Sequence, residues 1–194
     1  MEKNAENSDK NWQQSVYDSM RDRFSRGYVQ VYTGNGKGKT TAALGLSIRA
    51  LGAGMRVFFS QFIKGAKYSE IDILSAFENL THRQYGLGCF IMRAPTDEDK
   101  AAARQGIEEV REAMNSGRYQ LVILDEANVA SHLGLIPASD LVALAREKPE
   151  AVELLFTGRN APAELIELAD LVTEMREIKH YYDKGVKARR GIES

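Results

Sequence analysis

The feature that most constrains the fold is a loop with three alternating glycines, which reads Gly34-Asn35-Gly36-Lys37-Gly38-Lys39-Thr40. A strand is predicted over residues 28–33 before it, and a helix from about Thr40 after it. Glycines let successive backbone N–H groups turn toward one anion, and the helix points its N-terminus at the same place. The order of strand, loop and helix therefore predicts a site for the phosphates of a nucleotide, most simply ATP with magnesium.

Two side chains of the loop carry the expected chemistry. The usual pattern ends in Gly-Lys-Ser/Thr, so we expect Lys39 to neutralise phosphate oxygens and the Thr40 hydroxyl to bind Mg²⁺. The pattern also begins with a glycine, and Thr33 stands at that position here. Lys37 has two interpretations, a phosphate contact or a solvent-exposed side chain. A glycine-rich turn that binds nothing is the alternative for the whole loop.

An acidic pair follows the apolar run 121–124, which is typical of a central parallel strand covered on both faces. In phosphate-loop proteins an acid at this place completes the magnesium site, so Asp125 and Glu126 are candidate metal ligands. The alternative is a solvated pair that ends a strand. The residues alone leave open whether Glu126 binds metal or activates water.

Strands alternate with helices along the chain, which predicts a three-layer α/β domain over residues 27–194, like a phosphate-loop NTPase, with a mainly parallel sheet. Strands are expected at 28–33, 55–62, 82–85, 121–124, 152–156 and 171–175, and helices after the glycine-rich loop, near 71–77, behind the Thr96/Asp99 capping box, at 138–147 and after Pro162. The helix after the loop carries the apolar residues Leu44, Ile48 and Leu51, and Gly52 and Gly54 are expected to end it.

The N-terminal residues have a different composition. Residues 1–10 are polar and are expected to form a disordered tail. An apolar residue then recurs every fourth position, which predicts a helix over residues 11–26. The residues of this stripe are Trp12, Val16, Met20 and Phe24.

Composition excludes several classes of protein. The net charge of -1 provides no basic field for nucleic acid or an anionic membrane, and no apolar run approaches the roughly 18 residues of a membrane span. A single cysteine and a polar N-terminus fit a reducing cytoplasm.

These motifs, with the C-terminal third, resemble the corrinoid adenosyltransferases of the phosphate-loop type. The similarity covers about residues 28–193, in order, and its closing part is the most specific. The matching segments are residues 31–43, 61–65, 122–126, Thr157-Gly158-Arg159, Leu168-Ala169-Asp170, Lys179-His180, Gly185-Val186-Lys187-Ala188 and Gly191-Ile192-Glu193.

The resemblance implies that cobalt(I) of a reduced corrinoid attacks the 5′ carbon of ATP and that triphosphate leaves, in adenosylcobalamin biosynthesis or salvage. It implies that ATP lies reversed in the loop, for which Thr33 in place of glycine is the family's usual form. Lys39 and Glu126 are the implied catalytic residues, with Glu126 as a magnesium ligand rather than a base. The implied nucleotide-binding residues are Gly34, Asn35, Gly36, Lys37, Gly38, Lys39, Thr40, Thr41, Arg49 and Arg159, and the metal ligands are Thr40, Asp125 and Glu126.

On the corrinoid side, the family pattern Gly-x-Gly-Phe-x-Trp is replaced by Gly86-Leu87-Gly88-Cys89-Phe90-Ile91. Cys89, Phe90 and Ile91 are therefore corrinoid-side candidates, and the Lys179-His180 match implies that His180 is a further candidate, as a hydrogen-bonding residue of the corrin or nucleotide site. The resemblance also implies a homodimer, whose N-terminal helix covers the active site, and a reducing flavoprotein as electron donor. The alternative hypotheses for the function are another phosphate-loop ATPase, a small-molecule kinase and a non-catalytic nucleotide-binding regulator.

Overall fold

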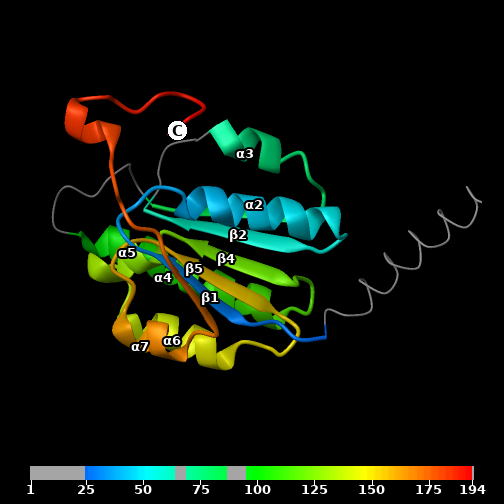
Figure 1. Cartoon of the computed structure of the whole chain (residues 1–194). Helices are drawn as coiled ribbons and strands as arrows, with labels where there is room; N and C mark the ends of the chain where they lie inside the picture. Colours follow the sequence, from blue (N-terminus) through cyan, green and yellow to red (C-terminus); the bar gives the residue numbers. More distant parts are fainter. Residues whose placement is uncertain (1–24, 64–68, 87–94, 194) are drawn as a thin grey trace, which may run out of the picture.

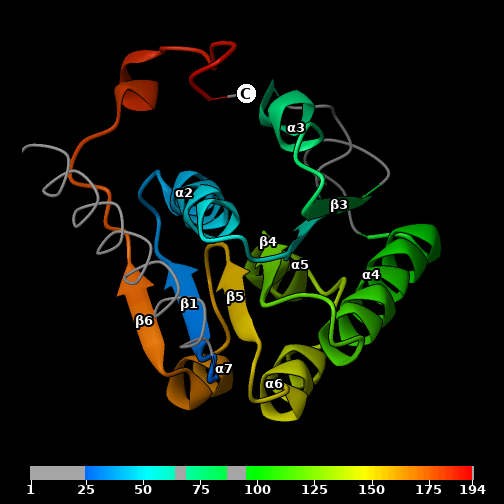
Figure 2. The ribbon, with the colours of Figure 1, turned by 90° about the vertical axis from the view of Figure 1, so that its right-hand side faces the viewer.

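A six-stranded parallel sheet forms the middle layer of the fold (Figures 1 and 2). The computed structural model describes residues 25–63, 69–86 and 95–193. The strands lie in the order β3-β2-β4-β5-β1-β6, and all neighbours are parallel. Their bounds are β1 Val29–Thr33, β2 Val57–Phe62, β3 Leu80–Tyr85, β4 Leu121–Asp125, β5 Glu153–Thr157 and β6 Leu171–Glu174.

Helices cover both faces of this sheet, as Figure 2 shows. Helices α2 and α3 lie on one face, and α4, α5, α6 and α7 lie on the other. The predicted three-layer architecture is confirmed. The bounds are α2 Lys39–Gly52, α3 Ser69–Leu74, α4 Asp97–Asn115, α5 Ala127–His132, α6 Ala138–Glu147 and α7 Ala163–Leu168, followed by a short 3-10 helix, η1, at Tyr181–Lys184.

Strand β4 shows why its sequence is continuously apolar. Every residue of the strand is buried. Val122 and Leu124 belong to the core beneath α4 and α6, while Leu121 and Ile123 belong to the core beneath α2. Because successive side chains of a strand point to opposite faces, a strand covered on both sides needs apolar residues at every position.

The helix α4 follows its prediction closely. Thr96 and Asp99 form the predicted capping box, with each side chain accepting from the backbone N–H of the other. The predicted apolar positions Ala103, Ile107, Val110 and Met114 are all buried. The helices α5 and η1 were not predicted, since neither short segment carries enough periodic residues to reveal a helix.

The apolar residues of α2 divide into two groups, because Leu44 and Leu51 are partly buried and pack against the core beneath this helix, whereas Ile48 does not. Ile48 is 48% exposed, whereas Ala43, Ser47 and Ala50 are buried. Lys39 is buried on the same side as these three, at helical spacing. Small residues therefore lie closest to the sheet, and Leu44 and Leu51 are partly buried beside them.

The N-terminal predictions fall mostly beyond the part of the chain that the structure describes. The tail 1–10 lies outside the described residues, as does the predicted helix 11–26 apart from its last two residues. Those two, Ser25 and Arg26, are not helical. The helix and its proposed cover over the site therefore stay predictions.

Candidate functional site

The glycine-rich loop joins the carboxyl end of β1 to the start of α2 and closes around Lys39. This side chain is almost entirely enclosed, since the residue is 7% exposed. Its Nζ donates hydrogen bonds to the carbonyl oxygens of Gly34 at 2.7 Å and Gly36 at 2.8 Å. The ammonium group is therefore held at the centre of the loop, where a phosphate would meet it.

The structure gives a second reason, not evident from the sequence, why glycine is required in this loop. The backbone after β6 runs against the loop, and the N–H of Gly36 donates to the carbonyl of Met175 at 2.7 Å. A Cβ on Gly34 would lie 2.5 Å from the oxygen of Met175, and one on Gly36 would lie 2.7 Å from the oxygen of Arg176. Close approach of two backbone segments excludes side chains here, in addition to the positive φ of 91° at Gly34.

The N–H of Gly36 is thus directed at Met175 rather than at an anion. The first turn of α2 begins at Lys39, directly after Gly38 at its N-cap. The first N–H groups of a helix lack intrahelical partners and form an anion-binding end. We therefore expect a phosphate to be held by the start of α2 together with Lys39, while Gly36 anchors the loop to β6.

Asp125, at the end of β4, is fully buried and accepts hydrogen bonds from side chains of α2, β2 and β5. Its Oδ1 accepts from the hydroxyls of Thr40 at 2.9 Å and Thr157 at 2.7 Å, and its Oδ2 accepts from Gln61 Nε2 at 3.1 Å. These four residues, which we name the Asp125 network, join the ends of β2, β4 and β5 to α2. Fully satisfied buried groups of this kind hold a site rigid.

Sequence reasoning missed Gln61 and Thr157 as members of this site. Both are buried polar residues at the carboxyl end of a parallel strand, the edge where α/β proteins bind ligands. A polar residue at the end of a predicted parallel strand was the sequence signal that could have identified Gln61 and Thr157. A further contact joins His82 Nε2 to Gln61 Oε1 at 3.1 Å. Because the Gln61 amide nitrogen donates to Asp125, its oxygen accepts, and His82 Nε2 carries the proton.

The electrostatics of Lys39 reveal which charged groups surround it. Burial lowers the pKa of Lys39 from its ordinary value; Arg159 lowers it further, whereas Glu126 and Asp125 oppose this shift. The predicted residues Lys39, Asp125, Glu126 and Arg159 are therefore close enough to interact. Glu126 begins α5 in a left-handed conformation, and its N–H donates to Thr157 Oγ1 at 3.0 Å.

The oxygen donors beside the loop fit a magnesium ion. The hydroxyl of Thr40 and the carboxylate of Asp125 are in direct contact, and hydroxyl and carboxylate oxygens are ligands that Mg²⁺ prefers. Within the described ranges, no three His, Cys, Asp or Glu side chains are grouped as a metal site. Mg²⁺ commonly binds through one or two protein groups, with waters and substrate phosphates completing its shell, so the residues present suffice.

Other predicted residues are not brought together with the loop's centre. Arg49 lies in the last turn of α2, about 15 Å along the helix from Lys39. There it opposes the rise in the pKa of Tyr32, which burial chiefly causes and Glu153 increases. Asn35 and Thr41 are exposed.

The corrinoid-side candidates divide into two groups. Cys89, Phe90 and Ile91 lie outside the described residues. His180 caps η1, because its Nδ1 accepts from the N–H of Tyr182 at 3.0 Å, and its ring lies 4.9 Å from that of Tyr181. Within the described chain His180 therefore has a structural task, the start of the turn after β6.

Comparison with known proteins shows the family of the chain. Residues 25–194 match the sequence model of ATP:corrinoid adenosyltransferases of the BtuR/CobO/CobP group. The chain belongs to this family. The match includes the loop, the Asp125 network and the segment after β6, so the resemblance of the motifs to corrinoid adenosyltransferases is confirmed.

Relatives share this sequence over most of their length. A corrinoid adenosyltransferase of Sinorhizobium sp is 38% identical over 172 residues, which are 87% of this chain and 80% of the relative. That of Escherichia coli (strain K12) is 34% identical, over 87% of this chain and 86% of the relative. Corrinoid adenosyltransferase CobA of Salmonella typhimurium is 32% identical, over 93% and 95%.

A solved structure supports the fold alone. The cytoplasmic domain of EssC aligns with a TM-score of 0.52 at 16% identity, over 84% of this chain. This chain spans 34%, about a third, of the EssC chain. None of the described helices has both the length and the apolar character needed to cross a membrane.

Proposed function

We propose that this chain transfers the 5′-deoxyadenosyl group of ATP to cobalt(I) of a corrinoid, in adenosylcobalamin biosynthesis or salvage. The observation that carries the proposal is the enclosed Lys39 beside the Thr40–Asp125 contact, in a chain that belongs to the ATP:corrinoid adenosyltransferases. A cobalt–carbon bond forms at the 5′ carbon, the carbon–oxygen bond to the triphosphate breaks, and its electron pair leaves on the triphosphate oxygen. Reduced cobalt is itself the nucleophile, so the protein needs none of its own.

The protein's part in this reaction is to position ATP and to stabilise the leaving charge. Lys39 and Arg159 supply positive charge, and the start of α2 supplies N–H donors. Thr40 and Asp125, with Glu126 beside them, would hold Mg²⁺, which when bound supplies further positive charge at the triphosphate. We assign Glu126 to this metal site rather than to water activation, because attack by water would waste ATP.

The partners belong to the same proposal. A reducing flavoprotein would supply the electron that makes cobalt(I), the chain would act as a homodimer in the cytoplasm, and residues 11–26 would cover the site. Cys89, Phe90 and Ile91 would face the corrinoid where the family pattern has aromatic residues. Sedimentation with and without ATP tests the dimer.

Product analysis tests the reaction. We expect the purified protein, given ATP, Mg²⁺ and chemically reduced cobalamin, to form a light-sensitive adenosylated corrinoid and one triphosphate for each. A kinase would instead produce ADP, an ATPase would produce ADP and phosphate, and a nucleotide-binding regulator would leave ATP intact. Any of these results without the light-sensitive product contradicts the proposal.

A further inference from the structure

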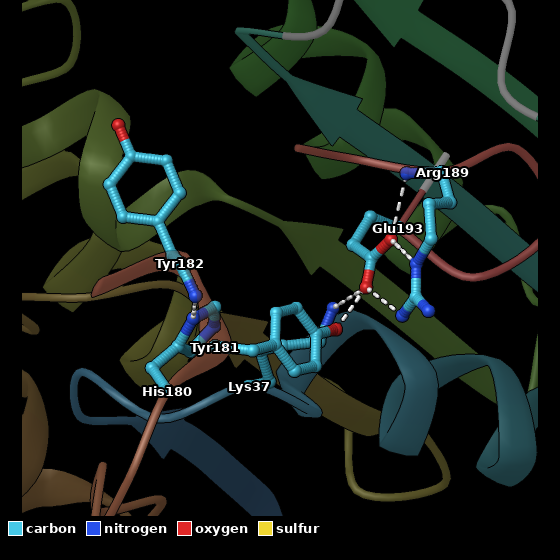
Figure 3. A network of polar contacts seen from close by, with 6 residues as sticks. All are labelled: Lys37, His180, Tyr181, Tyr182, Arg189 and Glu193. Carbon is cyan, nitrogen blue, oxygen red and sulfur yellow. Dashed lines mark hydrogen bonds and ion pairs between the residues drawn. The ribbon is translucent and has the colours of Figure 1, made fainter. Parts of the chain in front are cut away.

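The segment after β6 returns to the phosphate loop through a group of polar side chains (Figure 3). Figures 1 and 2 show this part of the chain rising on the α2 and α3 side of the sheet. Its last described residue, Glu193, lies 3.6 Å from the Nζ of Lys37, measured to its Oε1 atom. This ion pair joins the C-terminal end of the described chain to the rim of the nucleotide site.

Glu193 is held firmly by its own segment. Its Oε2 accepts from the backbone N–H of Arg189 at 2.8 Å, and its Oε1 accepts from Arg189 Nη2 at 3.2 Å and from the hydroxyl of Tyr181. The Arg189 guanidinium also lies 5.2 Å from the centre of the Tyr181 ring. We name Lys37, Tyr181, Arg189 and Glu193 the Glu193 network.

The charge of Glu193 is stable in this setting. Hydrogen bonds from the Arg189 side chain, and then from Tyr181, lower the pKa of Glu193 to about 2 from its ordinary 4.5. Its side chain is only 13% exposed, whereas that of Lys37 is 45% exposed. The carboxylate is therefore held in place by its own segment, and Lys37 is the more exposed partner of the pair.

The pair with Lys37 leaves that ammonium group available to a ligand. Lys37 Nζ lies 3.6 Å from Glu193 and its side chain is 45% exposed, so the ammonium can donate to phosphate oxygens while attraction to the carboxylate limits where it moves. Arg189 already balances the charge of Glu193, so the network of two cations and one anion keeps a positive charge of one at the rim. A triphosphate would be attracted rather than repelled.

We propose that Glu193 is a positioning residue for nucleotide binding, which holds Lys37 at the rim of the phosphate loop so that its ammonium meets the triphosphate with less loss of side-chain freedom. The inference rests on the proposed function only in that the loop binds ATP. It assigns a role in nucleotide binding to the segment that ends at Glu193. Of the two interpretations of Lys37, it favours the phosphate contact. Long lysine side chains lose much rotamer freedom when they are ordered, so a partner that orders one in advance improves affinity.

Calorimetric titration of the full chain with ATP and Mg²⁺, without corrinoid, tests this step. We expect Glu193→Gln to weaken ATP binding about two- to fivefold, the range of an exposed ion pair. In the Lys37→Ala background the same substitution should change the Kd little, because its effect passes through Lys37. Tyr181→Phe, which removes one hydroxyl donor to Glu193, should weaken binding less and also depend on Lys37.

The matched control is Glu177→Gln, an exposed acid earlier in the same segment, which should leave the Kd unchanged. An equal loss with and without Lys37 would overturn the inference, because Glu193 would then act only through the fold of the segment. Unchanged or tighter binding in Glu193→Gln would overturn it too, since Glu193 would then be irrelevant or a competitor of ATP. Product analysis with corrinoid is a separate assay, so each proposal can fail without the other.

Discussion

The Asp125 network contacts the phosphate loop at Thr40 and the Glu193 network contacts it at Lys37, and the two are built differently. Asp125 is completely buried and accepts hydrogen bonds from three neighbours on different elements. Glu193 is held mainly by its own segment, near exposed cations. The first network joins the sheet to α2, and the second joins the C-terminal segment to the rim of the loop.

This difference separates two kinds of contribution. Leaving a buried polar group without a partner costs about 1–3 kcal/mol, whereas an exposed ion pair contributes about 0.2–1 kcal/mol. Loss of a buried group should therefore affect both stability and turnover. Loss of the ion pair between Glu193 and the exposed Lys37 should adjust ligand affinity and leave the fold intact.

The largest expected effect comes from Lys39. Replacement by alanine removes the enclosed ammonium from the leaving triphosphate, and we expect turnover to fall by at least roughly 100-fold, as for other groups that stabilise transition-state charge. Steady-state assay of adenosylated corrinoid measures this, with circular dichroism to check the fold. Near-normal turnover would remove the loop from the mechanism.

Lys148 is the matched control for Lys39. Its Nζ also donates to two backbone carbonyls, those of Gly27 at 2.7 Å and Pro149 at 3.1 Å, but at the opposite end of the sheet. Lys148→Ala should lower the free energy of unfolding by about 1–2 kcal/mol and leave turnover unchanged. Equal losses of activity in the two variants would mean that Lys39 matters only for the fold.

The next effect is expected at Asp125. Asn at this position is nearly isosteric, but its amide would set an N–H₂ against one of the donors of Thr40, Thr157 or Gln61. We expect a loss of about 1–3 kcal/mol in stability and a weaker response of activity to added Mg²⁺. Urea unfolding and a magnesium titration measure the two. Asp97→Asn, an exposed acid in α4, should change neither by much, and a wild-type magnesium response in Asp125→Asn would exclude Asp125 from the metal site.

The smallest effect should be seen in the pH response of Glu193. Its folded-state pKa of about 2 lies below the ordinary 4.5, so the contribution of its charge to stability is complete above pH 4.5 and is lost as the pH falls toward 2. The carboxyl carbon of Glu193, followed by NMR, should therefore still show the chemical shift of an ionised carboxylate at roughly pH 3.5. Replacing Arg189 by Gln should move the midpoint up toward 4.5, and a midpoint already near 4.5 in the native chain would show that the network is not formed.

Much of the fold followed from local sequence patterns. The continuous apolar run before Asp125 predicted a doubly covered strand, and the Thr96/Asp99 box predicted the start of α4. Each is encoded within a few neighbouring residues. The face of α2 was less predictable in this way, because its fully buried positions hold Lys39 and small residues rather than the largest apolar ones.

The site, like the fold, has features that are encoded locally in the sequence and others that depend on the tertiary structure. By itself, the sequence determined that Lys39 and Thr40 follow a strand and that an acid ends a buried one, because motif spacing and strand patterning are local. Only the tertiary structure decided that Gln61 and Thr157 complete the shell of Asp125, that Met175 passes too close to Gly34 for a side chain, and that Glu193 returns to Lys37. These pairs are distant in sequence, and only the order of strands in a parallel sheet makes them neighbours.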